Sequence, residues 1–235
     1  MNILALDTAT EACSVALRVG NVVISRFVVA GRSHTQALPR QVAEVLAEAG
    51  LAPAALDGVV CGIGPGSFAG LRIGLSYAKG LAMVADLPMV GISSLQMMAE
   101  ATTSPRVLTV IDARLSAVYA AAWQRDAAGG WQAQWPPMLC APEDLPAAED
   151  IAGAWQGVGS GFSVYRDALA TAWQAPLIDL DADALPDARH ALKAGQAMLM
   201  RGEGIDASQL QPLYLRNKVA LTQVEQRALR APRRG

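Results

Sequence analysis

The sequence predicts a duplicated α/β fold, in which two units each follow the order strand, strand, strand, helix, strand, helix. The pattern of apolar runs restarts after Pro105, and the first strand of each half ends in an aspartate, Asp7 and then Asp112. The 235 residues are 52% hydrophobic and 17% charged, which is enough apolar material for a core in each half. A duplicated unit explains this repetition better than two unrelated domains.

The first half opens with three strands in a meander. Residues 2–7 form a short apolar run, and residues 12–19 and 22–29 are rich in residues that favour strands. The turn dipeptide Gly20-Asn21 separates the second strand from the third.

A helix is expected to follow, over about 33–50. Ser33 and Gln36 suggest a capping box, Pro39 fits a first turn, and Gly50 is a natural C-terminal stop. The apolar residues of the segment fall on one helical face. They are Leu38, Val42, Val45, Leu46 and Ala49.

The same signals divide the rest of the chain. Further strands are expected at 58–63, 88–91, 106–112, 116–124, 131–135 and 154–158, and further helices at 67–85, 93–101, 142–149, 162–172 and 186–202. We expect one subdomain over residues 1–103 and a smaller one over 104–205. The segment at about 206–225 should pack back on the first half, because chain termini often lie close together.

Several function classes find little support. Cys13, Cys61 and Cys140 form no C-x-x-C pair and sit among small apolar residues, which indicates buried, inert thiols. His34 and His190 are the only histidines, so a zinc or Ser-His-Asp site has little material. A net charge of −2 is not that of an autonomous nucleic-acid binder. No apolar run suggests a membrane helix or a signal peptide, and we expect a cytoplasmic protein.

The most informative stretch runs from Gly64 to Gly74, between an apolar strand and a helix. A glycine loop at a helix N-terminus suits an anion or a phosphate. The spacing matches neither the Walker motif nor the Rossmann fingerprint. The alternative, which we favour, is that Pro65-Gly66 makes a tight turn and Ser67 caps the helix.

The helix behind this loop carries a stripe of small residues that recur every four positions. They are Gly66, Gly70, Gly74, Ala78 and Ala82. Glycines at 70, 74 and 80 together forfeit about 3 kcal/mol of helix propensity, and close approach of another backbone would offset this loss. That backbone could belong to the chain's own sheet or to a second protein.

Taken together, the motifs resemble the bacterial TsaB family, also called YeaZ, along the whole chain. The glycine segment is the most specific of them. The matching segments are Leu6-Asp7-Thr8, Ser33-His34-Thr35 to Leu38-Pro39, Gly64-Pro65-Gly66-Ser67-Phe68 to Gly74, Ser93-Ser94-Leu95, Ile111-Asp112-Ala113-Arg114 with Val118-Tyr119, and Pro212-Leu213-Tyr214-Leu215-Arg216.

The resemblance implies two ribonuclease-H-like units, as in the actin, sugar-kinase and Hsp70 fold. It implies a role in threonylcarbamoylation of the adenosine next to the anticodon (t6A) of tRNA. The implied partners are a catalytic subunit, TsaD, and an ATPase, TsaE. ATP and tRNA would be used by the complex and not by this chain alone.

In the family, the helices that match 35–50 and 67–85 pack against the equivalent pair of TsaD. The resemblance therefore implies a partner interface at His34, Leu38, Val42, Val45, Gly66, Ser67, Gly70, Leu71, Gly74 and Ala78. The same stripe could form a homodimer when the partner is absent. Two positions depart from the family pattern: Ala69 replaces a usual threonine, and Ala117 replaces a usual glutamate.

Catalysis by the chain itself finds little support in the residues. The turn from Asp7 to Glu11 has no glycine to admit a phosphate, and Glu11 would repel one. His34 is followed four positions later by Leu38, where metal-binding relatives carry a second histidine, so we expect His34 to be a capping or interface residue. We expect no catalytic, cofactor or metal site; the alternative is an ATP-dependent transferase or peptidase in its own right.

Three features of the sequence each have two possible interpretations. Asp7 and Asp112 could be paired carboxylates across a cleft, although turn-forming aspartates are the commoner case. Residues 157–161 (Gly-Val-Gly-Ser-Gly) could contact an adenosine or form a plain loop. The basic tail could touch tRNA phosphates or be solvated. Its arginines are Arg227, Arg230, Arg233 and Arg234.

Overall fold

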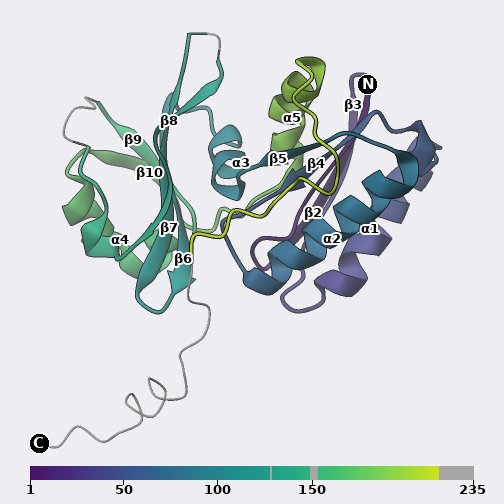
Figure 1. Ribbon diagram of the computed structural model, residues 1–235. Coiled ribbons are helices and arrows are strands. Elements are labelled where there is room, and N and C mark those ends of the chain that lie inside the picture. Colours follow the sequence, from purple (N-terminus) through teal and green to yellow (C-terminus); the bar gives the residue numbers. More distant parts are fainter. Residues whose placement is uncertain (128, 149–152, 217–235) are drawn as a thin grey trace, which may run out of the picture.

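The computed structural model describes residues 1–127, 129–148 and 153–216. Within these ranges the chain forms two five-stranded sheets, ordered β3-β2-β1-β4-β5 and β8-β7-β6-β9-β10 (Figure 1). The first contains β1 (Asn2–Asp7), β2 (Ala12–Val19), β3 (Val22–Val29), β4 (Gly58–Gly62) and β5 (Met89–Ile92). The second contains β6 (Arg106–Arg114), β7 (Ala117–Arg125), β8 (Trp131–Cys140), β9 (Trp155–Val158) and β10 (Leu177–Asp181).

The two sheets repeat one topology. In each, the first three strands pair antiparallel, and the first strand also pairs in parallel with the fourth, which pairs in parallel with the fifth. This confirms the predicted duplicated α/β fold.

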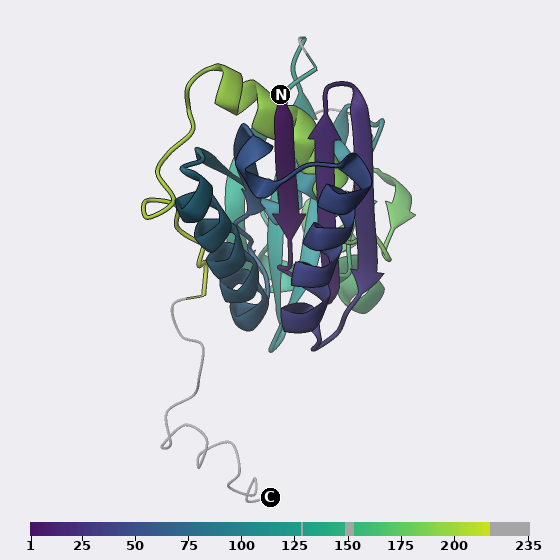
Figure 2. The same cartoon turned by 90° about the vertical axis from the view of Figure 1, so that its right-hand side faces the viewer.

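Helices cover both faces of the first sheet. The side chains of β1 alternate between the faces. Leu4 and Leu6 enter a core with α1 (His34–Ala49) and α2 (Phe68–Ala85). Ile3 and Ala5 enter a second core with α5 (Ala191–Met200). Figure 2 shows α1 and α2 side by side on the near face of this sheet.

The remaining helices belong to the second sheet and to the space between the sheets. The helix α4 (Gly161–Trp173) packs on the second sheet around Trp155 and Trp173. The short helix α3 (Ser94–Glu100) contributes Leu95 and Met98 to a core with β6 and β7. The two halves are therefore joined through packed side chains as well as through the chain.

Several predicted elements differ from the structure in the second half. The helix predicted at 142–149 is a 3₁₀ turn at Pro142–Asp144 within the described residues. The strand predicted at 131–135 continues to Cys140, because it lies at a sheet edge, where prolines are tolerated. The strand β10 was not predicted. The helix predicted at 186–202 is α5, preceded by a 3₁₀ turn at Ala188–His190.

The start of α1 also differs from the prediction. Ser33 makes no side-chain cap, because its hydroxyl donates instead to the Ala30 carbonyl at 2.7 Å. The helix begins at His34, so Pro39 lies in its second turn and not its first. The expected stop is confirmed, since Gly50 adopts a left-handed conformation with φ of 65°.

The chain after β10 returns to the first sheet. The helix α5, expected in the second subdomain, packs on the first sheet instead. Ile205 then exchanges two backbone hydrogen bonds of 2.9 Å with Met89 at the edge of β5. Leu213 N–H donates to the Ile63 carbonyl at 2.8 Å. Arg216 finally donates to the Ala113 carbonyl in the second half at 3.0 Å.

Residues 217–225 of the expected returning segment, and all four arginines of the basic tail, lie outside the described residues. Among the helices that the structure describes, none has the length and apolar character needed to cross a membrane.

Candidate functional site

The inner face of α2 packs against the chain's own β1–β2 turn. A Cβ added at Gly70 would lie 2.1 Å from the Thr8 carbonyl oxygen, and one at Gly66 would lie 2.1 Å from the Ala9 carbonyl oxygen. A Cβ at Gly74 would lie 2.3 Å from Thr8 Oγ1. The glycines are therefore required where α2 meets the backbone of its own molecule.

Hydrogen bonds hold this contact together. Thr8 Oγ1 donates to the Gly70 carbonyl at 2.7 Å, and Ser67 N–H donates to the Ala9 carbonyl at 2.6 Å. Ala78, further along the stripe, is completely buried. The idea that a foreign backbone presses into this particular groove is wrong, because the groove is already filled.

Most of the residues expected at a partner interface are consequently buried. Of that set Ser67 is exposed and Gly66 is half-buried. The others are core residues: His34, Leu38, Val42, Val45, Gly70, Leu71, Gly74 and Ala78. Apolar spacing on a helix marks the face turned to the core, and sequence alone does not distinguish that face from one turned to a partner.

His34 and Gln41 anchor the inner face of α1. His34 Nε2 donates to the Ala12 carbonyl at 3.1 Å, and Gln41 Nε2 donates to the Cys13 carbonyl at 3.3 Å. Both side chains are buried. His34 therefore ties α1 to β2 and neither caps the helix nor reaches the surface.

The outer face of α2 is exposed and has small or apolar side chains for most of its length. Its exposed residues are Phe68, Ala69, Arg72, Ser76, Gly80, Met83 and Val84. The side chains of Met83 and Val84 are 69% and 89% exposed. A Cβ added at Gly80 would meet nothing within 4 Å. This face contains no acidic residue.

The signal for this outer face was present in the sequence as a second stripe. Ala69, Ile73, Ser76 and Gly80 recur at helical spacing, offset from the buried stripe. On the neighbouring helix α1, Thr35, Pro39, Ala43 and Ala47 are exposed at four-residue spacing. Small side chains thus form one stripe on the outer side of each helix, beside larger exposed residues such as Arg40 and Glu44 on α1 and Arg72 on α2.

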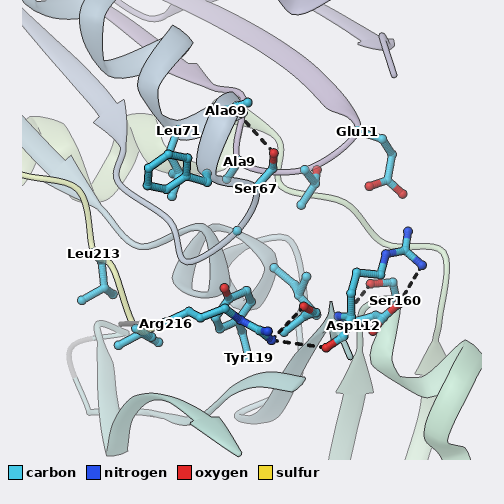
Figure 3. A pocket seen from close by; sticks show the side chains of 18 of the residues that line it. Ala9, Glu11, Ser67, Ala69, Leu71, Asp112, Tyr119, Ser160, Leu213 and Arg216 are labelled. Atoms are coloured by element: carbon cyan, nitrogen blue, oxygen red, sulfur yellow. Dashed lines mark hydrogen bonds and ion pairs between the residues drawn. The ribbon is translucent and has the colours of Figure 1, made fainter. Parts of the chain in front are cut away.

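A cavity of about 780 Å³ lies between the two halves of the molecule (Figure 3). It is lined by the β1–β2 turn, the start of α2, the end of β6, the start of α4 and the C-terminal segment. Glu11, Asp112 and Arg216 are among the polar residues in its wall.

Asp112 and Arg216 in this cavity are paired within the chain, whereas the side chains of Glu11 and Arg32, which also line it, have no hydrogen-bond or ion-pair partner among the described residues. Asp112 Oδ1 accepts from Arg114 N–H at 2.8 Å, and Asp112 Oδ2 lies 2.9 Å from an Arg114 guanidinium nitrogen. Asp112 N–H donates to Ser160 Oγ at 3.1 Å. Arg216 is engaged by the Ala113 carbonyl, as Figure 3 shows.

Asp7 and Asp112 occupy different environments and do not act as paired carboxylates. Asp7 is buried, and its Oδ1 accepts from Ala9 N–H at 2.9 Å while its Oδ2 accepts from Ser94 Oγ at 2.7 Å. Burial raises the pKa of Asp7 despite these two hydrogen bonds. Each aspartate accepts from a backbone N–H two residues later, which confirms the turn interpretation for Asp7 at the end of β1. Asp112 instead lies within β6, where the register with β7 shifts.

The glycine segments have structural explanations in the described residues. Ser67 Oγ accepts from Gly70 N–H at 3.3 Å, so the capping interpretation is confirmed. In the second segment, a Cβ added at Gly161 would lie 2.3 Å from a Val110 side-chain carbon, and Gly159 has φ of 112°. These glycines are needed for packing and for backbone conformation, as in a plain loop.

The thiols and histidines form no reactive cluster. Burial raises the pKa of the Cys13 thiol to about 11 and also raises the pKa values of Cys61 and Cys140. Burial lowers the pKa of His190. No group of three metal-ligating side chains comes together anywhere in the described ranges.

Sequence reasoning missed a buried polar network around Asp187. Ser14 Oγ donates to Asp187 Oδ1 at 3.2 Å and accepts from Ala188 N–H at 2.8 Å. Burial alone would raise the pKa of Asp187, but hydrogen bonds from Arg189 lower it below its usual value. Ser14 and Asp187 are too far apart in sequence for any local pattern to reveal this contact.

Comparison with known proteins gives consistent results. The family model described as "TsaD: tRNA N6-adenosine threonylcarbamoyltransferase" matches residues 21–224. The chain is 38% identical to the tRNA threonylcarbamoyladenosine biosynthesis protein TsaB of Escherichia coli K12, over 94% of this chain and 96% of that one. It is 34% identical to the protein of that name from Haemophilus influenzae, over 93% of this chain and 95% of that one.

A solved structure supports the same conclusion about the fold. YeaZ from Pseudomonas aeruginosa superposes with a TM-score of 0.83 at 36% sequence identity, covering 91% of this chain and 99% of that one. The predicted actin-like α/β fold is therefore confirmed by comparison as well as by topology.

Proposed function

We propose that this chain, which belongs to the TsaB (YeaZ) family and takes part in tRNA threonylcarbamoyladenosine biosynthesis, is a non-catalytic subunit. Its role would be to bind and organise the catalytic TsaD subunit. The ATP, the tRNA and the ATPase TsaE would then be engaged by the complex. The observation that carries this proposal is the exposed outer face of α2.

That face suits a close helix–helix contact. Its central positions are small, its end carries the exposed side chains of Met83 and Val84, and its one glycine has open space above it. The family model that bears the name of TsaD matches this chain, which supports a partner of the same fold with an equivalent pair of helices. Two such pairs could pack ridge into groove, with the backbones closest at Gly80.

The cavity between the two halves of the molecule supports the proposal that the chain itself is not a catalyst. Asp112, Arg114 and Arg216 are engaged within the chain, Glu11 adds a negative charge to the wall, and Arg32 is the one arginine of the lining without a partner among the described residues. A site for a nucleotide would need free donors for its phosphates. An ATP-dependent transferase or peptidase remains the alternative. It predicts ATP or peptide hydrolysis by the isolated chain that Asp112→Asn abolishes.

The direct test is the substitution Gly80→Leu. Leucine is about 1 kcal/mol better than glycine in a helix, and the site has room for it, so the variant should fold at least as well as the wild type. Its side chain would keep a facing helix away. We expect loss of the complex when the variant is mixed with TsaD of the same organism, measured by light scattering.

The matched control is Arg166→Leu, which places the same residue on the exposed part of α4. This variant should bind TsaD as the wild type does. Unchanged binding by Gly80→Leu would reject the outer face of α2 as the interface. Gly74→Leu is unsuitable for this purpose, since it would overpack the core and unfold the chain whether or not a partner binds.

A further inference from the structure

The cavity between the two halves contains a buried polar group that the chain itself leaves unpaired. Tyr119 lies on β7 in the wall of the cavity and is only 8% exposed, and its hydroxyl has no hydrogen-bond partner among the described residues. In Figure 3 the Tyr119 side chain points from β7 toward the start of α2. Buried hydroxyls are normally paired, so this one indicates a partner that comes from outside the chain.

Arg216 supplies a positive charge to the same cavity. Its Nη2 donates to the carbonyl oxygens of Ala113 at 3.0 Å and Arg114 at 3.2 Å, and no acidic side chain among the described residues pairs with it. The Arg216 side chain is half-buried, so salt and water screen its charge only in part. Because both acceptors are neutral, the charge of this guanidinium remains available to an anion.

The helix α2 begins at this cavity and adds a third group of donors. In an α-helix the first N–H groups have no partner within the helix, and the helix dipole makes this end positive. The Ser67 cap accepts only from the N–H of Gly70, so the N–H groups of Phe68 and Ala69 in the cavity wall have no partner among the described residues. A helix N-terminus alone is not a binding site, but this one lies where the unpaired Tyr119 hydroxyl points.

The charged side chains of the wall favour an anion of low charge. Three arginines and two acids line the cavity, which gives a net charge of +1 when histidine is counted as neutral. Asp112 is neutralised by Arg114 at 2.9 Å, while Glu11 and Arg32 are exposed and have no partner among the described residues. Glu11 would repel an anion with several charges, such as a nucleotide. A single carboxylate matches the excess of one arginine.

The remainder of the wall is largely apolar, and the cavity is large enough for a small molecule. Phe68, Ile111 and Leu213 are among its apolar side chains, and its volume of about 780 Å³ is within the range of small-molecule sites. We propose that the cavity binds an organic molecule with one carboxylate and an apolar body. The carboxylate accepts from the Tyr119 hydroxyl, the Arg216 guanidinium and the start of α2, and the body lies against the apolar side chains.

The ligand class is tested by titration calorimetry of the isolated full-length chain with phenylpropionate, which has one carboxylate and an apolar body. Phenylpropionamide is the matched neutral compound. The wild type should bind phenylpropionate saturably and the amide roughly tenfold more weakly, because hydrogen bonds to an ionised group are about twice as strong as those between neutral groups. An acetylated phenylalanine dipeptide, used with a free or an amidated C-terminus, shows whether a peptide C-terminus can supply the carboxylate in place of a small free acid.

The assigned groups are tested by substitution. Tyr119→Phe removes only the hydroxyl, so it should weaken phenylpropionate binding roughly tenfold. It should leave the urea midpoint unchanged, since that hydroxyl has no partner among the described residues. Arg216→Met should weaken binding by a similar factor. The matched control is Arg201→Met, at an exposed arginine outside the cavity wall, which should bind phenylpropionate as the wild type does.

Three results would overturn the proposal: no saturable binding of phenylpropionate, equal binding of its amide, or an unchanged affinity in Tyr119→Phe. Tighter binding of inorganic phosphate or ATP than of phenylpropionate would overturn it as well. The proposal does not rest on the contact with TsaD, because the isolated chain is used. The Gly80→Leu variant should bind phenylpropionate as the wild type does, so failure of one proposal is distinguishable from failure of the other.

Discussion

Alanine substitutions at two glycines of α2 should have opposite effects on stability. At Gly70 the new Cβ would lie 2.1 Å from the Thr8 carbonyl oxygen, whereas ordinary contacts begin at 3.4 Å. The helix and the β1–β2 turn would have to separate by more than an ångström, which also strains the 2.7 Å hydrogen bond from Thr8 Oγ1 to the Gly70 carbonyl. At Gly80 the same methyl group meets nothing.

The expected magnitudes follow from these contacts. Alanine gains about 1 kcal/mol of helix propensity at either site. At Gly70 overpacking costs about 1–3 kcal/mol, and the weakened hydrogen bond costs about 1 kcal/mol more. Gly80→Ala should therefore be more stable than the wild type by about 1 kcal/mol. Gly70→Ala should be less stable than Gly80→Ala by roughly 2–4 kcal/mol.

The assay is urea unfolding of both variants. When the unfolding free energy falls with urea concentration at the same slope in both, the difference between their midpoints reports the difference in stability. Using two positions of one helix removes the common effect of glycine on the unfolded chain. Equal midpoints for Gly70→Ala and Gly80→Ala would show that α2 does not press on the turn of its own chain.

Three further predictions concern the buried polar groups. Thr8→Val should lower the unfolding free energy by about 1 kcal/mol, because valine cannot donate to the Gly70 carbonyl; urea midpoints would show it. Burial raises the pKa of Asp7, so its contribution to stability falls as pH rises above the usual aspartate value of about 3.9. Asp7→Asn should lessen that fall, which unfolding free energies measured between acid and neutral pH would show. An unchanged dependence of the unfolding free energy on pH would contradict this prediction. The pKa of Asp187 is lowered by Arg189, so that pair stabilises the fold at neutral pH and is lost as the pH falls below about 3.9. Arg189→Ala should cost about 1–3 kcal/mol at neutral pH and less in acid, which unfolding at both pH values would reveal.

The first half of the fold could be predicted from local patterns because its strands and helices carry strong periodicity. The restart of the apolar pattern after Pro105 correctly indicated the duplication, although β1 ends at Asp7 and β6 continues two residues beyond Asp112. The second half was harder. β8 contains Pro136 and Pro137, which argue against a strand unless it lies at an edge, and β10 has three apolar residues among aspartates. Edge position is a tertiary property that local sequence does not record.

The candidate site shows a different limit. The spacing of Gly70 and Gly74 correctly indicated a close backbone contact, but the spacing is the same whether the second backbone is internal or foreign. Thr8, which fills the groove, lies 62 residues from Gly70 in the sequence. The contact between Ser14 and Asp187 was invisible for the same reason. Only the three-dimensional structure distinguished the inner face of α2 from the outer one.

Methionine oxidation offers the most direct test of the claim that the outer face of α2 meets TsaD. Met83 on α2 and Met200 on α5 are 69% and 72% exposed, so the free chain should oxidise at both at similar rates. Peptide mass spectrometry can follow each residue with and without TsaD. We predict that TsaD protects Met83 and leaves Met200 unchanged. Equal oxidation of Met83 in the free and the bound chain would contradict the account.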